Sequence, residues 1–322
     1  MTHNPVISVE GLYKRFNLEA GFFARFGHFV KAINGLDFYI GKNESYGLVG
    51  ESGCGKTTAA RLLVRMYTPD AGNISFCGEG QEPLNILSFN KKELKKYREK
   101  VKYVFQDPAR SLNPRMTIHE ILTAGKRWSS NKGNKNYREE AEAILEEVGL
   151  NAKDLWRKPS EFSGGQRQRI SIARALLMKP ELLICDEVVS ALDVSIQGQI
   201  LNLLLDIRSR RDLSFLFIAH DLKVASYFCD RIGVMYRGEL MEEAGAETLW
   251  QKGVHPYTEL LFSSVSGSQI ESTKITHEAI SGKDCCSFAH RCIYAEKHCC
   301  NEKPDLKEIA SGHKVRCFLK GV

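Results

Sequence analysis

The sequence lacks any long hydrophobic run. Its 322 residues are 43% apolar, yet no stretch reaches the ~18 consecutive apolar residues that a membrane helix needs. It also does not open with a basic segment followed by an apolar one, so we expect no secretory signal. These absences argue against an integral membrane protein. We therefore expect a peripheral protein that reaches the cytoplasmic face of the cell membrane through partner subunits.

The chain also lacks a strong excess of charge. Charged residues make up 26% of it, and the formal net charge is +6. The most basic stretch, residues 91–100, interrupts its lysines with Glu93 and Glu99, which is typical of a solvated helix face. We therefore expect no nucleic-acid partner. The length allows one large domain or two ordinary ones.

The most informative stretch is 50–57, which matches the phosphate-binding P-loop pattern G-x-x-x-x-G-K-[ST]. An apolar run at 46–49 predicts a buried strand before it, and the spacing of apolar residues over 56–66 predicts a helix after it. This order of strand, loop and helix disfavours the alternative, a plain glycine turn before a helix. The residues expected to contact a nucleotide are Gly50, Glu51, Ser52, Gly53, Cys54, Gly55, Lys56, Thr57 and Thr58.

Each residue type in this loop has a chemical reason to be there. Glycines let backbone N–H groups point inward around an anion, and the N-terminus of the next helix adds the positive end of its dipole. Lys56 can then reach the β- and γ-phosphates, while the Thr57 hydroxyl can bind Mg²⁺. The sequence therefore predicts a nucleotide site with a magnesium ion.

A second anion site is predicted at residues 163–166. Ser163 and Gln166 stand in the S-x-x-Q spacing of a capping box, and the apolar spacing that follows predicts a helix ending before Pro180. Two glycines leave the N-terminus of that helix open to an anion. An ordinary capped helix is the alternative. However, Ser163, Gly164, Gly165 and Gln166 resemble the signature motif of ATP-binding-cassette (ABC) ATPases.

The other motifs of that family follow in order. Residues 182–186 form an apolar run closed by Asp186, which resembles the Walker B strand. Glu187 follows where the family places the carboxylate that polarises the attacking water, and residues 190–193, ending at Asp193, resemble its D-loop. By this resemblance the Mg²⁺ ligands are Thr57, Gln106 and Asp186.

Three further residues resemble single family positions. His220, at the end of the apolar run 214–219, resembles the H-loop histidine, and Gln106 resembles the Q-loop glutamine. Phe16 resembles the aromatic residue that stacks on adenine, although the nearby Tyr13 could serve. Taken alone, His220 and Phe16 are also compatible with core positions, and Asp186 with a strand-end cap. The resemblance gives Lys56, Glu187 and His220 the catalytic roles.

The resemblance implies an α/β fold with a P-loop ABC ATPase core. That core has a RecA-like lobe, an antiparallel β-subdomain and an inserted helical subdomain at about residues 107–165. We expect the nucleotide-binding domain to span 1–262, a serine-rich linker 263–276, and a small cysteine-rich C-terminal extension 277–322. In the family the signature motif completes the ATP site of a second cassette. Because this chain has one P-loop and one signature, it needs a partner cassette.

The C-terminal extension holds six of the ten cysteines. Their spacing, Cys286-x₅-Cys292-x₆-Cys299 and then Cys317, lacks the C-x₂₋₄-C pairs usual for zinc. Four widely spaced thiolates favour a four-iron four-sulfur cluster, with zinc or no metal as alternatives. Cys285, Cys300, His290, His298 and His313 are further candidate ligands. A disulfide framework is not expected in a reducing cytosol.

Several segments narrow the resemblance to the oligopeptide and dipeptide permease ATPases, the peptide/nickel importer group. These are 105–108, 111–118, His255-Pro256-Tyr257-Thr258 and 286–292, the last without the prolines of the family motif. Residues 113–116 and an insertion at 20–29 resemble the second of that group's two ATPases. The implied partners are a sister ATPase forming a heterodimer, two transmembrane permease subunits and an extracytoplasmic substrate-binding protein. A nickel or metal-chelate importer, and a non-transport ABC ATPase, remain the alternatives.

Overall fold

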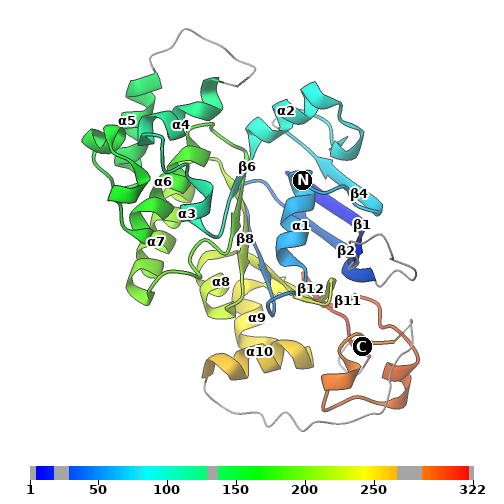
Figure 1. Cartoon of the computed structure of the whole chain (residues 1–322). Helices are drawn as coiled ribbons and strands as arrows, with labels where there is room; N and C mark the ends of the chain where they lie inside the picture. The colour runs from blue at the N-terminus through cyan, green and yellow to red at the C-terminus, as the bar shows by residue number, and fades with distance from the viewer. Residues whose placement is uncertain are drawn as a thin grey trace, which may run out of the picture.

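The computed structural model describes residues 5–17, 29–78, 80–127, 129, 137–266 and 285–318. Figure 1 shows two β-sheets, a group of helices on one side and a C-terminal unit at the opposite end. The insertion predicted at 20–29 lies outside the described residues except for its last position. The strands are β1 Ile7–Asn17, β2 Phe29–Ile40, β3 Ser45–Val49, β4 Ala71–Phe76, β5 Leu84–Asn85, β6 Val101–Val104, β7 Leu182–Asp186, β8 Ser214–Ala219, β9 Arg231–Tyr236, β10 Glu239–Gly245, β11 Lys307–Ala310 and β12 His313–Val315.

The larger sheet has the strand order β11-β12-β10-β9-β3-β8-β7-β6. Strands β9, β3, β8, β7 and β6 are parallel, and β9, β10, β12 and β11 pair antiparallel. Every residue of β3, β7 and β8 is buried. Parallel strands covered on both faces are apolar throughout, which is why their sequences are continuous hydrophobic runs. The strands predicted at 46–49, 182–186 and 214–219 are confirmed.

The smaller sheet is antiparallel, with the order β2-β1-β4-β5. Burial along β1 and β2 is partial, with buried and exposed residues interspersed. This is the pattern of a sheet with one face on the core and the other toward water. The predicted antiparallel β-subdomain is therefore present beside the parallel core, and the fold is the expected α/β architecture.

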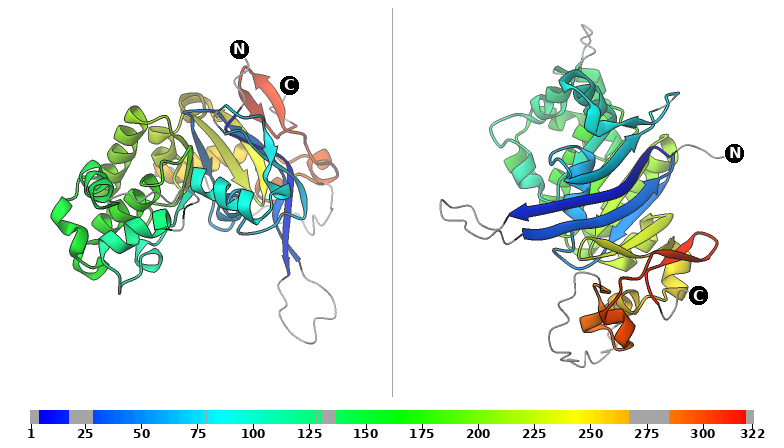
Figure 2. Two further views of the ribbon diagram at one scale, coloured as in Figure 1. Left: turned by 90° about the horizontal axis from the view of Figure 1, so that it is seen from above. Right: turned by 90° about the vertical axis from the view of Figure 1, so that its right-hand side faces the viewer.

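Helices cover the sheet and form a separate group at one end of the molecule. The helices are α1 Lys56–Leu63, α2 Lys91–Lys100, α3 Pro108–Ser111, α4 Ile118–Arg127, α5 Tyr137–Glu147, α6 Gly164–Leu176, α7 Val194–Arg210, α8 Leu222–Phe228, α9 Ala246–Lys252 and α10 Pro256–Ser266. Both views in Figure 2 place the helical group, α3 to α6, at the end away from the C-terminal unit. The structure therefore places its inserted helices where the sequence predicts a helical subdomain.

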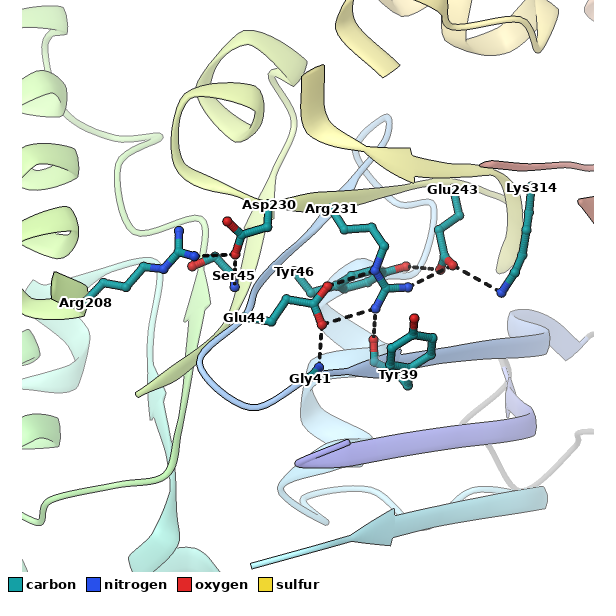
Figure 3. Close-up of polar contacts among 10 residues, drawn as sticks. All are labelled: Tyr39, Gly41, Glu44, Ser45, Tyr46, Arg208, Asp230, Arg231, Glu243 and Lys314. Atoms are coloured by element: carbon teal, nitrogen blue, oxygen red, sulfur yellow. Dashed lines mark hydrogen bonds and ion pairs between the residues drawn. The ribbon is translucent and has the colours of Figure 1, made fainter. Parts of the chain in front are cut away.

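A charged cluster ties β2, β3, β9, β10 and β12 together (Figure 3). Arg231 donates to Glu44 at 2.8 Å, to Glu243 at 2.9 Å and to the Tyr39 carbonyl at 2.7 Å. Tyr46 also donates to Glu243, at 2.8 Å. The Glu243 side chain is only 3% exposed, and a buried carboxylate is tolerated when its oxygens are paired in this way. The cluster thus joins the parallel strands to the strands that follow them.

The C-terminal unit is attached to the larger sheet by backbone pairing and by buried side-chain contacts. Strand β12 pairs with β10, and the His313 ring lies 2.7 Å from a carboxylate oxygen of the buried Glu242. Two short 3₁₀ helices, Ala289–Arg291 and Lys297–Cys300, lie in this unit, and the second carries Cys299 and Cys300. Helix α10 continues to Ser266, so the helix extends four residues past the predicted start of the linker. Residues 267–276 of that linker lie outside the described part of the chain.

Candidate nucleotide site and cysteine cluster

The parallel strands bring the predicted site residues to one edge of the sheet. Strand β3 pairs in register with β8, and β8 pairs with β7, so that Val49 lies opposite Ala219 and Asp186 opposite Ile218. The loop 50–57 follows β3, Glu187 follows β7 and His220 follows β8. Carboxyl ends of parallel strands meet at a common edge, which is where α/β sheets place ligands.

The P-loop follows the path expected from its glycines. A Cβ added at Gly50 would lie 2.1 Å from the Met235 carbonyl oxygen, and one added at Gly55 would lie 2.3 Å from the Ala32 carbonyl oxygen. Gly55 also has φ 111°, in the range that favours glycine. These contacts leave no room for a side chain at either position. The loop is thereby held against the neighbouring strands, with α1 beginning directly at Lys56.

Lys56 is buried at 4% exposure, unusual for a lysine. Its ammonium donates to the carbonyl oxygens of Gly50 at 2.6 Å and Glu51 at 3.0 Å. The cation is therefore held inside the loop by the loop's own backbone. A phosphate group cradled there would meet both the loop amides and this charge, which fits the predicted role of Lys56.

The structure brings two of the three predicted magnesium ligands together. The Thr57 hydroxyl donates to Asp186 Oδ1 at 3.0 Å. Hydroxyl and carboxylate oxygens are the ligands that Mg²⁺ uses alongside phosphate oxygens, so this pair fits the ion. Gln106, the third predicted ligand, instead donates to Glu187 at 2.8 Å. The remaining Asp186 oxygen accepts from the Tyr103 hydroxyl, a contact with no signal in the sequence motifs.

Glu187 lies among the other predicted catalytic groups. With φ 48° its backbone adopts the left-handed conformation that non-glycine residues rarely take. Strain of this kind concentrates at functional sites. Glu187 and His220 line the same small cavity, together with Ser190 and Gln197. The structure therefore groups Gln106, Glu187 and His220 beside the Thr57–Asp186 pair.

Two other predicted residues have local partners. Phe16 packs edge-to-face on Tyr67, with ring centroids 5.2 Å apart, and the Lys14 ammonium lies 5.5 Å from its ring. Asp193 caps α7 by accepting from the Ile196 amide at 2.9 Å and from the Ser195 hydroxyl at 2.7 Å. These hydrogen bonds lower the pKa of Asp193, led by the one from Ser195. The D-loop carboxylate is thus a helix cap in this structure.

The signature segment forms the predicted capping box at the start of α6. The Ser163 amide donates to Gln166 Oε1 at 2.9 Å, and the Ser163 hydroxyl accepts from the Gln166 amide at 3.3 Å. Ser163, Gly164 and Gln166 are exposed, whereas Gly165 is buried against Ile196. The segment therefore presents a capped helix N-terminus at the surface.

Two protein-family models match the sequence of this chain. The model described as ABC transporter matches residues 33–190, and the model described as oligopeptide/dipeptide transporter, C-terminal region, matches residues 241–299. The chain belongs to the ABC transporter ATPase family. This ABC ATPase accordingly binds and hydrolyses ATP with Mg²⁺.

Curated relatives match over nearly the full length. The oligopeptide transport ATP-binding protein AppF of Bacillus subtilis is 41% identical, with 98% of this chain and 97% of the relative covered. A Brucella ovis protein named for peptide import is 40% identical over the whole of both chains. Solved structures show the same fold. A dimeric bacterial ABC transporter cassette, MJ0796, has a TM-score of 0.65 at 25% identity, covering 74% of this chain and 98% of that one. The cbiO1 protein of Clostridium perfringens has a TM-score of 0.65 at 23% identity, covering 78% and 92%.

No helix within the described ranges of this ABC ATPase is long and apolar enough to cross a membrane. The described helices that carry apolar faces pack them on the sheet or on one another. This agrees with the absence of long hydrophobic runs in the sequence.

The four predicted cluster cysteines of this ABC ATPase face one cavity. Cys286, Cys292, Cys299 and Cys317 all line it, and the Cys286 amide donates to the Cys299 carbonyl at 2.9 Å. Burial, together with the neighbouring cysteines, raises the pKa of Cys286 to about 11. All ten cysteines are free in this structure. Among the described residues, however, no three His, Cys, Asp or Glu side chains gather closely enough to hold a single metal ion.

Most of the other candidate ligands in this unit have different partners. His313 contacts Glu242, His298 lies 3.5 Å from Glu296, and His290 lies 3.3 Å from the Tyr236 hydroxyl. Cys300 points to the Glu296 carbonyl. None of these four side chains is among those lining the cysteine cavity. Cys285 is not in that lining either, so the candidate ligands that line the cavity are the four cysteines named first.

Two residues outside the nucleotide motifs contact the P-loop. The Glu51 amide donates to the Tyr257 hydroxyl at 2.8 Å, and Arg291 forms two hydrogen bonds with the Glu51 carboxylate. Tyr257 belongs to the His-Pro-Tyr segment singled out in the sequence, and Arg291 precedes Cys292. Motif resemblance indicated that both segments are typical of a family, but sequence spacing could not place either beside residue 51.

The geometry predicts different consequences for two site substitutions. Glu187→Gln keeps the shape and hydrogen bonding of the side chain but removes the negative charge, so ATP should bind while hydrolysis falls by about a hundredfold or more. Lys56→Ala should weaken ATP binding itself, because the phosphate-facing charge is lost. Binding by calorimetry and turnover by phosphate release separate the two effects. Wild-type turnover at this site in the Glu187→Gln protein would contradict the assignment.

Proposed function

We propose that this chain is the ATP-hydrolysing subunit of an importer for oligopeptides or dipeptides. The observation that carries the proposal is the match of residues 241–299 to the oligopeptide/dipeptide transporter C-terminal region. This region follows the P-loop in the sequence, where Thr57 and Asp186 are paired. The relatives named for peptide import support the same cargo class. We further propose the division into residues 1–262 for nucleotide binding and 277–322 for the cysteine-rich unit.

The proposed reaction relies on positioning and electrostatics. Phosphoryl transfer needs little covalent chemistry from a protein, so the charges around the γ-phosphate carry the rate. Lys56 and the loop amides would bind phosphate oxygens, and Thr57 and Asp186 would hold Mg²⁺. Glu187 would accept a proton from water or orient it, with Gln106 and His220 beside it. The Phe16 ring would stack on the adenine base of ATP.

The proposed complex contains more than this chain. An exposed, capped helix N-terminus at Ser163 suits the phosphates of an ATP molecule held by a second cassette. We propose that the second cassette is a different sister ATPase and that both dock on two transmembrane permease subunits. An extracytoplasmic substrate-binding protein would deliver the cargo. The whole assembly would place this chain at the cytoplasmic face of the membrane.

A transport assay in cells tests the proposed cargo. Cells lacking this gene should fail to take up labelled oligopeptides or dipeptides, and the native gene should restore uptake. The Glu187→Gln gene should not restore it, because the variant binds ATP without turnover. Restoration of nickel uptake alone, with peptide uptake unchanged, would favour the metal-chelate alternative.

The signature segment predicts an effect on the partner's site. Ser163→Arg should lower hydrolysis at the partner's P-loop by about tenfold or more, because a bulky cation replaces the capping hydroxyl at the shared phosphate site. Binding of ATP to this chain's own P-loop should remain within about twofold. Photolabelling each site separately in the assembled complex distinguishes the two. Loss at the chain's own site, with the partner's site intact, would refute the in-trans role.

We also propose a four-iron four-sulfur cluster in the C-terminal unit. Four cysteines around one cavity support it, since soft thiolates suit iron–sulfur cores. A cluster with several iron atoms needs one thiolate per iron, so the sulfurs need not converge on a single ion. The cluster would be structural, because a unit of this size has too few apolar residues for a core of its own.

Metal analysis of anaerobically purified protein tests the cluster. The protein should be brown and contain iron and acid-labile sulfide. Serine at Cys286, Cys292, Cys299 or Cys317 should lower the iron content, whereas Cys300→Ser should leave it unchanged, because Cys300 points away from the cavity. Stoichiometric zinc without sulfide would overturn the cluster, and a folded, metal-free unit would exclude both metals.

A further inference from the structure

The C-terminal cysteine unit reaches the nucleotide site through one side chain. Arg291 donates from both terminal nitrogens to the Glu51 carboxylate, at 2.7 and 2.8 Å. Glu51 is the second residue of the P-loop and lies 240 positions earlier in the sequence. Such a paired, planar contact fixes direction as well as distance. No motif of the family core accounts for it.

The Arg291 guanidinium also lies against two aromatic rings. It lies 5.7 Å from the ring centres of both Tyr236 and Phe288. Phe288 packs on Tyr236 and Tyr257, with centroids 5.3 Å away in each case. Arg291 and Phe288 both lie between Cys286 and Cys292. The fold of the cysteine segment therefore sets the position of the guanidinium.

The Glu51 carboxylate is surrounded by positive charge. Hydrogen bonding to Arg291 lowers its pKa, and the charges of Arg291, Arg237 and Lys56 act in the same direction. Lys56 is the cation proposed to meet the phosphates of ATP. Lys56 donates to the main-chain carbonyl of Glu51 at 3.0 Å, so the carboxylate of the same residue can compete with a phosphate for the lysine unless another cation holds it. Arg291 is the cation that hydrogen-bonds to it.

We propose that Arg291 is a positioning residue for ATP binding, supplied to the P-loop by the C-terminal cysteine unit. By holding the Glu51 carboxylate away from Lys56, it leaves the lysine available to phosphate. The Tyr257 hydroxyl, which accepts from the Glu51 amide, holds the backbone at the same position. This inference rests on the proposed nucleotide site and adds a requirement for the C-terminal unit.

Binding of MgATP to the full chain, purified anaerobically, tests the proposal. Arg291→Gln keeps the aliphatic stem on Phe288 but removes the charge, so its dissociation constant should rise roughly three- to tenfold, the range of a half-exposed bidentate ion pair. Glu51→Gln alone is the reference for the double variant, because Glu51 is itself part of the loop. The double variant Glu51→Gln/Arg291→Gln should bind within about twofold of Glu51→Gln alone, because no carboxylate remains to compete. A purely structural role for Arg291 would give no such recovery.

Three controls separate the ways in which the test can fail. Arg210→Ala removes another surface ion pair, with Asp206 on α7, and should leave binding unchanged. Native binding in the Lys56→Ala protein would count against the proposed nucleotide site rather than against Arg291. If Arg291→Gln does not fold, as judged by thermal unfolding, Arg291→Lys replaces it and should weaken binding about twofold, since lysine cannot make the paired contact. Unchanged binding in a folded Arg291 variant, or no recovery in the double variant, overturns the proposal.

Discussion

The parallel pairing of β3, β8 and β7 is the constraint on which the rest of the site depends. Its register places the ends of three strands together, so that the P-loop, Glu187 and His220 need only short continuations to meet. Burial of every residue in these strands makes that register difficult to shift, since a slip would disturb packing on both faces. The relative positions of the P-loop, Glu187 and His220 are therefore set by the sheet more than by the conformation of the loops.

Local features of the sequence were sufficient for much of the fold. Buried parallel strands are apolar runs, so β3, β7 and β8 were predictable, and the Ser163–Gln166 capping box formed as its spacing indicates. The sequence could not predict that Tyr103 would donate to Asp186 or that Arg291 would reach Glu51. Those contacts depend on strand order and on the docking of a distant unit, neither of which leaves a periodic pattern. Helix α10 also runs four residues into the predicted linker, because residues 263–266 continue the helix.

The charged cluster around Arg231 and the contacts of Arg291 lie at opposite ends of strand β9. Arg231 begins β9 and binds Glu44 and Glu243 (Figure 3). Tyr236 ends β9, and the Arg291 guanidinium lies against its ring. Strand β9 is therefore fixed at both ends by guanidinium groups, with the P-loop beside it at Met235. A disturbance in the cysteine unit has a short physical path to the nucleotide loop through this strand.

The pairing of β12 with β10 has a consequence for solubility. Without the C-terminal hairpin, β10 would be the terminal strand of the large sheet and would present unpaired backbone groups along its free edge. Such an edge is a template for intermolecular pairing. The hairpin replaces it with β11, a four-residue strand whose Lys307 and Glu308 are exposed. Short, charged edges resist strand addition, so the C-terminal unit also protects the ATPase core from aggregation.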